Sequence, residues 1–459
     1  MGNLKAKFSR AFWVANMAEM FERAAYYGVF VVITLYLSDI LGFSDLEAGI
    51  ISGLYASFLY FLPPFTGAYA DRIGFRKAML LAFTLLTIGY AGLALLPTGL
   101  EAAGLVEYGD TTLFTGLKTS GYRYLIVPVL VILVIGGSFI KGVISGSVAK
   151  ETDEKNRAQG FAIFYAMINI GSFSGKFIVE PLRESLGNSG LIYLNWFSVA
   201  MTLVALVAIY YFYKSDKARP DRSKSMRSVF SSFGKLCKNG RLVALILIVS
   251  GFWTVYYQLY ATMPKYVIRL AGEGSTVAWY TMLNPLIVIL TVNMLTRMLS
   301  KRTALYSIMC GMLLIPFSAL IMSSGNLFAE PILGLHPVVF MMLCGICVQA
   351  LAEALISPRY LEYFSLQAPK GEEGLYLGFA QLESFVSTLI GFTMSGWLLD
   401  KYCPDPKNFA THEEWLAASA DAHYIWYYFA AIAFVAAVAL IIYQRVVKRL
   451  DAKKALEQK

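Results

Sequence analysis

Apolar residues dominate this chain in twelve long segments, separated by short stretches that carry most of the charge. A helix needs about 20 apolar residues, at about 1.5 Å per residue, to cross the hydrocarbon core of a bilayer. The pattern therefore predicts an all-α membrane protein with twelve transmembrane helices. The predicted segments are residues 10–38, 47–70, 76–97, 123–149, 158–186, 190–213, 241–268, 275–297, 303–323, 334–365, 373–399 and 421–447.

Composition supports the same class of protein. Of 459 residues, 57% are hydrophobic and only 15% are charged, which excludes a soluble globular protein. The net charge of +9 lies mainly in short loops, so lipid headgroups are the expected contact and nucleic acid is not. The five scattered cysteines predict no disulfide framework, and no metal or cofactor site is predicted. The three histidines are all expected at the outer face, so proton handling within the membrane must use carboxylates.

The distribution of Lys and Arg predicts the topology. Most of them fall in the N-terminal tail, the loops after even-numbered segments and the C-terminal tail. By the positive-inside rule, both termini are cytoplasmic in a multi-pass protein of the cell (inner) membrane. A basic stretch between the sixth and seventh segments, with no further hydrophobic hairpin, divides the chain into two halves of six segments each. The predicted parts are residues 1–213, an N-terminal six-helix bundle; 214–240, a cytoplasmic basic linker; and 241–459, a C-terminal six-helix bundle with a cytoplasmic tail.

The first segment carries three ionisable residues, Glu19, Glu22 and Arg23, near the start of its apolar run. Each charge at membrane depth costs roughly 2.5–3.5 kcal/mol. At about 100° per residue these side chains share one helix face, and Glu19 and Arg23 are spaced to pair. The aromatic residues on the same face are Tyr26, Tyr27 and Phe30. The face is expected to line a substrate or ion pathway; the alternative is a structural ion-pair cluster that locks the helix.

Other charges also lie within apolar segments. Lys141 is too deep to reach the interface easily, and Lys176 is interpreted as facing a water-filled vestibule. Glu353 lies at mid-membrane above Ser357-Pro358, where a proline turn is expected to let the cavity wall bend. Nearer the cytoplasm, inner-gate ion pairing is expected from residues on two segments. They are Arg359, Glu362 and Glu383.

The junction of the second and third segments reads Gly67-Ala-Tyr-Ala-Asp71-Arg72-Ile-Gly74-Phe-Arg76. It resembles the loop motif of the major facilitator superfamily, in which Asp and Arg pair at helix ends and Gly permits a tight turn. Further motifs resemble those of the proton-dependent oligopeptide transporter family within that superfamily. They are Glu19-x-x-Glu22-Arg23 with Tyr26-Tyr27-Gly28, Tyr55-x-Ser57-x-x-Tyr60, the Gly-rich run to Lys141, Phe164-Tyr165-x-x-Ile168-Asn169, Asn284-Pro285-Leu286, and Glu353 followed by Ser357-Pro358.

The resemblance implies a fold of two six-helix bundles and a secondary active transporter rather than an enzyme. It implies proton-coupled symport of di- and tripeptides or peptide-like zwitterions by alternating access, in a monomer, with protons, a small-molecule substrate and the bilayer as partners. Proton coupling is assigned to Glu19, Glu22, Arg23, Lys141 and Glu353. Substrate binding is assigned to Arg23, Tyr26, Tyr27, Phe30, Tyr60, Lys141, Asn169, Trp253, Tyr257, Asn284, Glu353 and Ser357. Gating and the loop motif are assigned to Asp71, Arg72, Gly74, Arg76, Arg359, Glu362 and Glu383.

Two positions depart from the family pattern. Phe30 stands where the family commonly has an arginine for a peptide carboxylate, and Tyr257 stands where its seventh helix has an acid. Peptide selectivity and the details of coupling therefore stay open. The alternatives are a carrier, in uptake or export, of another organic solute such as an amino acid derivative, a drug or an anion, and a membrane sensor that binds a ligand without moving it.

Overall fold

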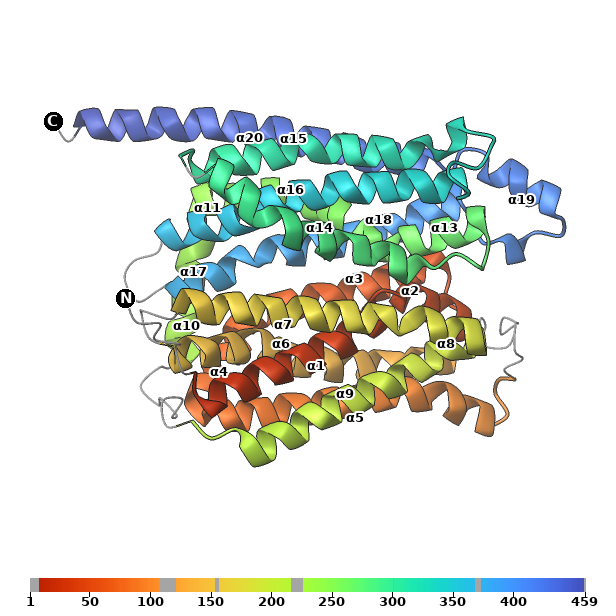
Figure 1. The fold of residues 1–459 in the computed structure, drawn as a ribbon, viewed down its shortest axis with the longest axis horizontal. Helices are drawn as coiled ribbons and strands as arrows, with labels where there is room; N and C mark the ends of the chain where they lie inside the picture. The colour runs from red at the N-terminus through yellow and green to blue at the C-terminus, as the bar shows by residue number, and fades with distance from the viewer. Residues whose placement is uncertain are drawn as a thin grey trace. The chain divides into compact units, whose positions relative to one another are not determined.

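The computed structural model describes residues 8–107, 121–152, 157–215, 226–299, 301–367 and 373–457, almost all of them in helices (Figure 1). They fold into two compact units. Unit 1 consists of Met1–Phe43 and Phe58–Phe230, and unit 2 consists of Ser44–Ser57 and Ser231–Lys459. The helix α3 (Asp45–Phe61) therefore begins in unit 2 and ends in unit 1.

The first helix of unit 1 starts at a side-chain cap, because Ser9 Oγ accepts a hydrogen bond from the Phe12 amide. The helical segment that follows, Ile33–Ile40, is inclined by 46° to Arg10–Phe30. Unit 1 contains α1 (Arg10–Phe30), α2 (Ile33–Leu35), a π-helical turn (Tyr36–Ile40), α4 (Pro63–Ile73), α5 (Phe75–Ala102), a 3-10 turn (Gly121–Leu125), α6 (Ile126–Glu151), α7 (Arg157–Phe177), α8 (Val179–Leu186), α9 (Ser189–Phe212) and the start of α10 (Met226–Cys237).

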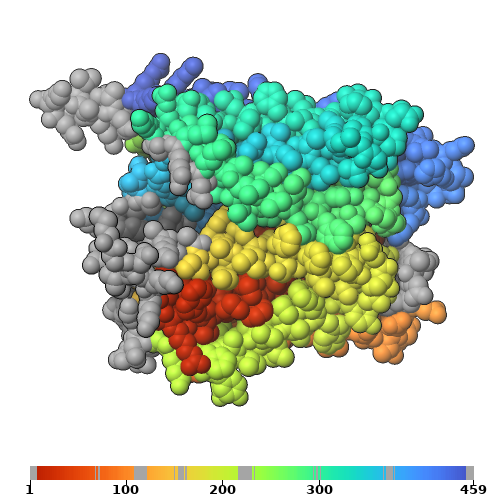
Figure 2. All heavy atoms as spheres, in the orientation of Figure 1, coloured from red at the N-terminus to blue at the C-terminus, as the bar shows by residue number. Residues whose placement is uncertain are grey.

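Small residues bring α7 close to α1. A Cβ at Gly171 would overlap the Met20 carbonyl, and one at Gly175 would overlap the Ala24 carbonyl. Backbones can approach this closely only where side chains are absent. On the other flank of α1, Ser198 of α9 donates to the Ala25 carbonyl at 2.9 Å. Figure 2 shows the side chains of α1 (red) bordered by those of α7 (yellow) and α9 (yellow-green).

In unit 2, several long helices are interrupted. The unit contains the first part of α3, the rest of α10, α11 (Gly240–Tyr256), α12 (Gln258–Ala261), α13 (Met263–Ala271), α14 (Val277–Met298), α15 (Ala304–Ser323), α16 (Pro337–Gln367), α17 (Glu373–Ala380), α18 (Leu382–Tyr402), α19 (His412–Ser419) and α20 (Tyr424–Glu457). The seventh predicted segment breaks at Tyr257 and Thr262, and the eleventh at Gln381.

The N-terminal part of α3 packs tightly on α18 within unit 2. Gly49 and Gly53 leave room for the Phe392 and Thr388 carbonyls of α18. One turn further, the Ser57 and Thr388 hydroxyls share a hydrogen bond of 2.9 Å. Glycines spaced four residues apart and a polar contact are typical of closely packed membrane helices.

The structure confirms the all-α membrane fold but not the count of twelve spans. Among the described residues, nine helices are long and apolar enough to cross a membrane, and the bent pair that begins with α1 makes a tenth. The two predicted segments outside this count lie on α7, which is rich in polar and small residues, and on α14, whose apolar stretch is the shorter Val277–Val292. The pattern did not predict α10 or α19, because both are short.

The helix α16 continues through Pro358, so the bend expected below Glu353 stays a prediction. In the turn that this proline disturbs, Ser307 Oγ of α15 donates to the Leu355 carbonyl at 2.8 Å. Membrane helices tolerate proline where neighbouring groups satisfy the freed backbone.

The close contact of α1 and α7 gives a stability prediction. Gly171→Ala should lower the free energy of unfolding by about 1–3 kcal/mol, because the new methyl group overlaps the α1 backbone. The matched control is Gly99→Ala in α5, where a Cβ meets nothing within 4 Å and helix propensity favours alanine by about 1 kcal/mol. Thermal unfolding of the purified variants measures both; equal stability of the two contradicts the packing account.

Candidate functional site

In unit 1, Arg23 is shared between two carboxylates of its own helix. Its Nε lies 3.2 Å from Glu19 Oε1, and its guanidinium also pairs with Glu22. All three residues are buried, at 4%, 1% and 7% exposure for Glu19, Glu22 and Arg23. The i,i+4 spacing predicted the Glu19 contact, and the contact with the adjacent Glu22 adds a second.

Two carboxylates against one guanidinium leave a negative charge when all three groups are ionised. Oε2 of Glu19 is buried and has no hydrogen-bond partner in the part of the chain that the structure describes. A buried carboxylate oxygen without a donor is costly unless a proton or another donor reaches it. Within this cluster, Glu19 Oε2 is therefore the oxygen that gains most from binding a proton, although it is buried.

A second cation approaches the cluster from α6. Lys141 is half-buried, and its Nζ lies 3.8 Å from the centroid of the Tyr60 ring on α3, close enough to Glu19 to interact electrostatically. An ammonium over a tyrosine face gains a cation–π attraction of about 0.5–2 kcal/mol. The predicted candidates Lys141 and Tyr60 thus meet near the α1 carboxylates.

Aromatic rings border the same cluster. The Arg23 guanidinium lies 5.2 Å from the Tyr26 ring, which stacks on Phe30 at 4.8 Å between centroids. Lys176 Nζ lies 5.1 Å from the Tyr27 ring and is only 1% exposed. The interpretation of Lys176 as facing a vestibule is wrong, because neighbouring side chains, including this ring, enclose it.

Asn169 lies apart from these contacts. Its Nδ2 donates to the Tyr165 carbonyl of its own helix at 2.8 Å, and the residue is half-buried. Its assignment to substrate binding stays a prediction.

In unit 2, the break between α11 and α12 starts a chain of hydrogen bonds to Glu353. Tyr256 donates from its hydroxyl to Asn284 Oδ1 at 3.3 Å, and Asn284 Nδ2 donates to Glu353 Oε2 at 3.1 Å. Gln349 Nε2 donates to the Tyr256 carbonyl, which the break has freed, at 3.1 Å. The predicted candidates Asn284 and Glu353 are thus held together, and Tyr256 is a member that the sequence did not indicate.

Two further predicted candidates of unit 2 present buried polar atoms. Nε1 of Trp253 and Oγ of Ser357 have no hydrogen-bond partner among the described residues. Buried donors of this kind usually serve a ligand or an ordered water. Trp253 also contacts Tyr257, with ring centroids 5.9 Å apart.

The gating candidates divide into those that the structure describes and those that it does not. The side chains of Asp71 and Arg72 lie outside the description, while Gly74 turns the chain at φ 87°. Arg76 donates to the Tyr210 carbonyl at 2.6 Å. Arg359 pairs with Glu362 at 2.7 Å, as their spacing indicated. Their roles as gates stay predictions.

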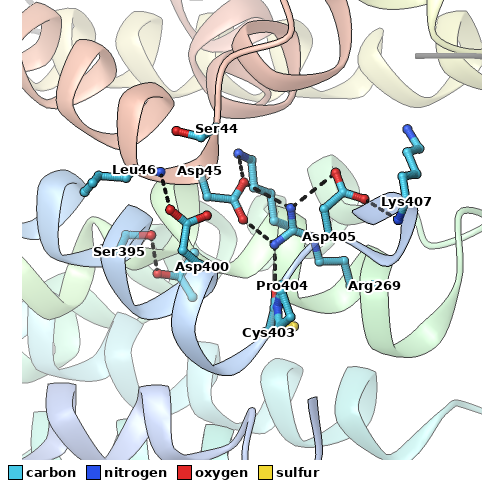
Figure 3. A network of polar contacts seen from close by, with 12 residues as sticks. Ser44, Asp45, Leu46, Arg269, Ser395, Asp400, Cys403, Pro404, Asp405 and Lys407 are labelled. Atoms are coloured by element: carbon cyan, nitrogen blue, oxygen red, sulfur yellow. Dashed lines mark hydrogen bonds and ion pairs between the residues drawn. The ribbon is translucent and has the colours of Figure 1, made fainter. Parts of the chain in front are cut away.

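An ion-pair network at the start of α3 was missed by the sequence reasoning (Figure 3). Asp45 accepts from Lys265 Nζ at 2.6 Å and from Arg269 Nη1 at 2.5 Å, both on α13. Arg269 also donates to the Cys403 carbonyl at 2.6 Å and lies 3.7 Å from Asp405. Each of these charges stands near the end of an apolar segment, where charges are ordinary, so only the fold reveals that they meet.

These observations define a multi-pass membrane protein whose helical units enclose ion pairs and polar chains, as carriers of small polar solutes do. Residues 15–335 match the family model described as Major Facilitator Superfamily. The chain therefore belongs to the major facilitator superfamily, whose members are membrane transporters and not enzymes.

Relatives of two kinds are similar to this chain. Multidrug resistance protein MdtH of Cronobacter sakazakii is 23% identical over 378 residues, which are 82% of this chain and 83% of the relative. Dipeptide and tripeptide permease B of Yersinia enterocolitica is 24% identical over 444 residues, covering 83% and 85%. A solved structure described under substrate recognition in proton dependent oligopeptide transporters aligns with TM-score 0.70 and 18% identity, over 96% of this chain and 99% of that one.

The Asp45 network gives a prediction for thiol chemistry. Burial raises the pKa of the Cys403 thiol to about 12, so little reactive thiolate exists at neutral pH. A maleimide should modify the exposed Cys237 quickly and the buried Cys403 slowly. Asp45→Asn should speed modification of Cys403 by about tenfold or more, because Arg269 loses the anchor that holds it on the Cys403 carbonyl. Unchanged Cys403 labelling in this variant, measured by mass spectrometry, contradicts the anchoring role.

Proposed function

We propose that this protein is a proton-coupled symporter of di- and tripeptides or similar zwitterions. The observation that carries the proposal is the buried cluster of Glu19, Glu22 and Arg23, with one carboxylate in excess and the unpartnered Oε2 of Glu19. The names of the permease relative and of the aligned transporter structure support the substrate class and the proton as driving ion.

The proton binds at Glu19 in this proposal. Glu22 receives two contacts from the guanidinium, whereas Glu19 receives one and keeps an unsatisfied oxygen. Protonation neutralises the Glu19 carboxylate. The Arg23 guanidinium, which stays positive, then has one anionic partner fewer and attracts another anion. The substrate carboxylate takes that place, assisted by Lys141, whose partner in the structure is the Tyr60 ring.

Unit 2 supplies the opposite charge. Glu353, oriented by Asn284, receives the amino group of the substrate, and the buried Trp253 Nε1 and Ser357 Oγ offer polar contacts to the peptide. A zwitterion thus finds cationic partners for its carboxylate and an anionic partner for its amino group, and alternating access carries it across the membrane.

Similarity to the multidrug resistance protein favours a second candidate, a carrier of another organic solute. Phe30, stacked on Tyr26, leaves the peptide carboxylate without an arginine at that position and gives the site an apolar wall. Competition between dialanine and an amphipathic drug in one uptake assay separates the two candidates.

Location, topology and assembly complete the proposal. The excess of basic residues in alternate loops supports a place in the cell (inner) membrane with both termini cytoplasmic. We propose that the transporting unit is the monomer, because both polar sites lie within one chain.

Replacement of the proton site gives the test. Glu19→Gln should reduce dialanine accumulation driven by an inward proton gradient in proteoliposomes at least about tenfold, since a neutral amide cannot release a proton. Counterflow, which exchanges labelled for unlabelled dialanine without net proton movement, should stay within about twofold of wild type.

The control is Glu101→Gln, at an exposed position in α5. It should behave like wild type in both assays. Gradient-driven accumulation by Glu19→Gln at the wild-type level rules out Glu19 as proton carrier, and wild-type uptake that ignores the proton gradient rules out symport.

A further inference from the structure

Glu383 is a buried carboxylate that the mechanism above does not use. It lies in the first turn of α18, immediately after the break at Gln381, and is 3% exposed. Its backbone is fixed from two sides, because Ser250 of α11 and Ser387 of α18 both donate to the Glu383 carbonyl. The position of this carboxylate is therefore set by the packing of α11 on α18.

A continuous chain of hydroxyl groups leads to this carboxylate. Tyr257 donates from its phenol to Ser384 Oγ at 3.1 Å, and Ser384 donates in turn to Glu383 Oε1 at 3.0 Å. Tyr257 lies at the break between α11 and α12 and is 6% exposed. Two hydroxyls that each donate towards a carboxylate form a path along which a proton can shift from one oxygen to the next.

We propose that Glu383 is a second proton-binding site, in unit 2, which exchanges its proton through Ser384 and Tyr257. This inference rests on the proposed function, since it assigns the site a place in proton-coupled transport. In the uptake step, Ser384 passes its hydroxyl proton to Glu383 Oε1 and takes the Tyr257 proton. Tyr257 then takes a proton from a hydronium ion, which leaves water, or from a substrate ammonium group, which leaves the neutral amine. The net change is one proton gained by Glu383, and both hydroxyls end neutral.

Of the three groups in this hydrogen-bonded series, Glu383, Ser384 and Tyr257, the carboxylate is the one suited to store the proton. A phenol ordinarily holds its proton up to a pH of about 10 and a serine hydroxyl beyond that, whereas a carboxyl ionises at lower pH. Titratable side chains near Glu383 include Tyr257, at the end of α11 and joined to it through Ser384, and Tyr360 of α16, which interacts with it electrostatically. These groups relay or solvate the proton and leave its storage to the carboxylate.

Because Glu383 lies beside the break between α17 and α18, its charge affects the stability of the start of α18. A negative side chain in the first turn stabilises a helix start, and a neutral one loses that attraction. Tyr360 donates to the Ala380 carbonyl at 3.0 Å, on the other side of the break between α17 and α18. Proton binding at Glu383 thus weakens one of the interactions that hold the start of α18, next to the break at Gln381.

A neighbouring series of hydrogen bonds leads to Glu353, the carboxylate that binds the substrate in the proposed function. Tyr256, adjacent to Tyr257, leads through Asn284 to Glu353. The two tyrosines at one helix break therefore connect to two different carboxylates, one on α16 and one on α18. The Asn284 amide cannot pass a proton as simply as a hydroxyl, so the chain to Glu383 is the better proton path of the two.

Infrared difference spectroscopy tests the proton site without reference to transport. Between mildly alkaline and mildly acidic buffer, purified wild-type protein should gain a band of a protonated carboxyl group that Glu383→Gln lacks. Ser384→Ala should retain the band but shift it, because the Oε1 hydrogen bond is lost. The control Glu414→Gln changes an exposed residue of α19 and should leave the band unchanged. A band of wild-type position and size in Glu383→Gln overturns the proposal.

Transport assays in proteoliposomes provide a second test of the Glu383 site. Glu383→Gln should lose at least about tenfold in dialanine accumulation driven by a proton gradient but retain counterflow within about twofold, and Tyr257→Phe should lose accumulation in the same direction. If wild type fails to accumulate dialanine, the symport proposal fails while the infrared result still decides on Glu383. If Glu383→Gln does not fold, wild-type behaviour of both Ser384→Ala and Tyr257→Phe in spectrum and uptake overturns the relay.

Discussion

A guanidinium shared by two carboxylates inside one apolar helix is the constraint on which unit 1 depends. Each of these charges costs roughly 2.5–3.5 kcal/mol at membrane depth when unpaired, so Glu19, Glu22 and Arg23 must stay together. The bare Gly171 on α7 allows the α1 backbone to approach beside Arg23, and the hydroxyl of Ser198 ties α9 to the other flank. The fold thus encloses two carboxylates beside Arg23, with Lys141 as a second cation near Glu19. In the proposed mechanism, a proton on Glu19 compensates when these two cations turn to the substrate carboxylate.

In unit 2, buried polar side chains serve mainly to satisfy backbone groups at helix breaks. A broken membrane helix exposes backbone groups that must find partners. At the break after α11, the Gln349 amide satisfies the Tyr256 carbonyl, and the two tyrosines at the break turn their hydroxyls towards Asn284 and Ser384. The irregular backbone and the polar chains therefore occur together. Irregular backbone of this kind is common at the substrate and ion sites of membrane carriers.

Much of the helical fold and part of the site follow from the sequence. The apolar segments predicted the helices, and helical spacing predicted that Glu19 meets Arg23 and that Arg359 meets Glu362. These pairs lie on single helices, where periodicity alone fixes the distance. The count of twelve spans did not follow, because hydropathy does not show where a segment breaks or shortens, as at Gln381.

Contacts between segments that are distant in the chain could not be predicted from the sequence. Asp45 meets Lys265 and Arg269 across more than two hundred residues, and nothing in the local pattern marks them as partners. The same holds for the link from Glu383 through Ser384 to the helix break at Tyr257, while the inner-gate ion pairing expected of Glu383 stays a prediction. Lys176 was misread for a related reason, since a lysine that is enclosed by protein and one that faces water have the same sequence signature.

The most direct test of the central claim, that buried carboxylates couple protons to a zwitterionic substrate, is the reversal potential of dialanine transport. In proteoliposomes with opposed dialanine and proton gradients, the gradient ratio at zero net flux gives the number of protons moved with each substrate molecule. The account predicts at least one proton per dialanine. A dialanine flux that reverses at equal dialanine concentrations, whatever the proton gradient, would contradict it.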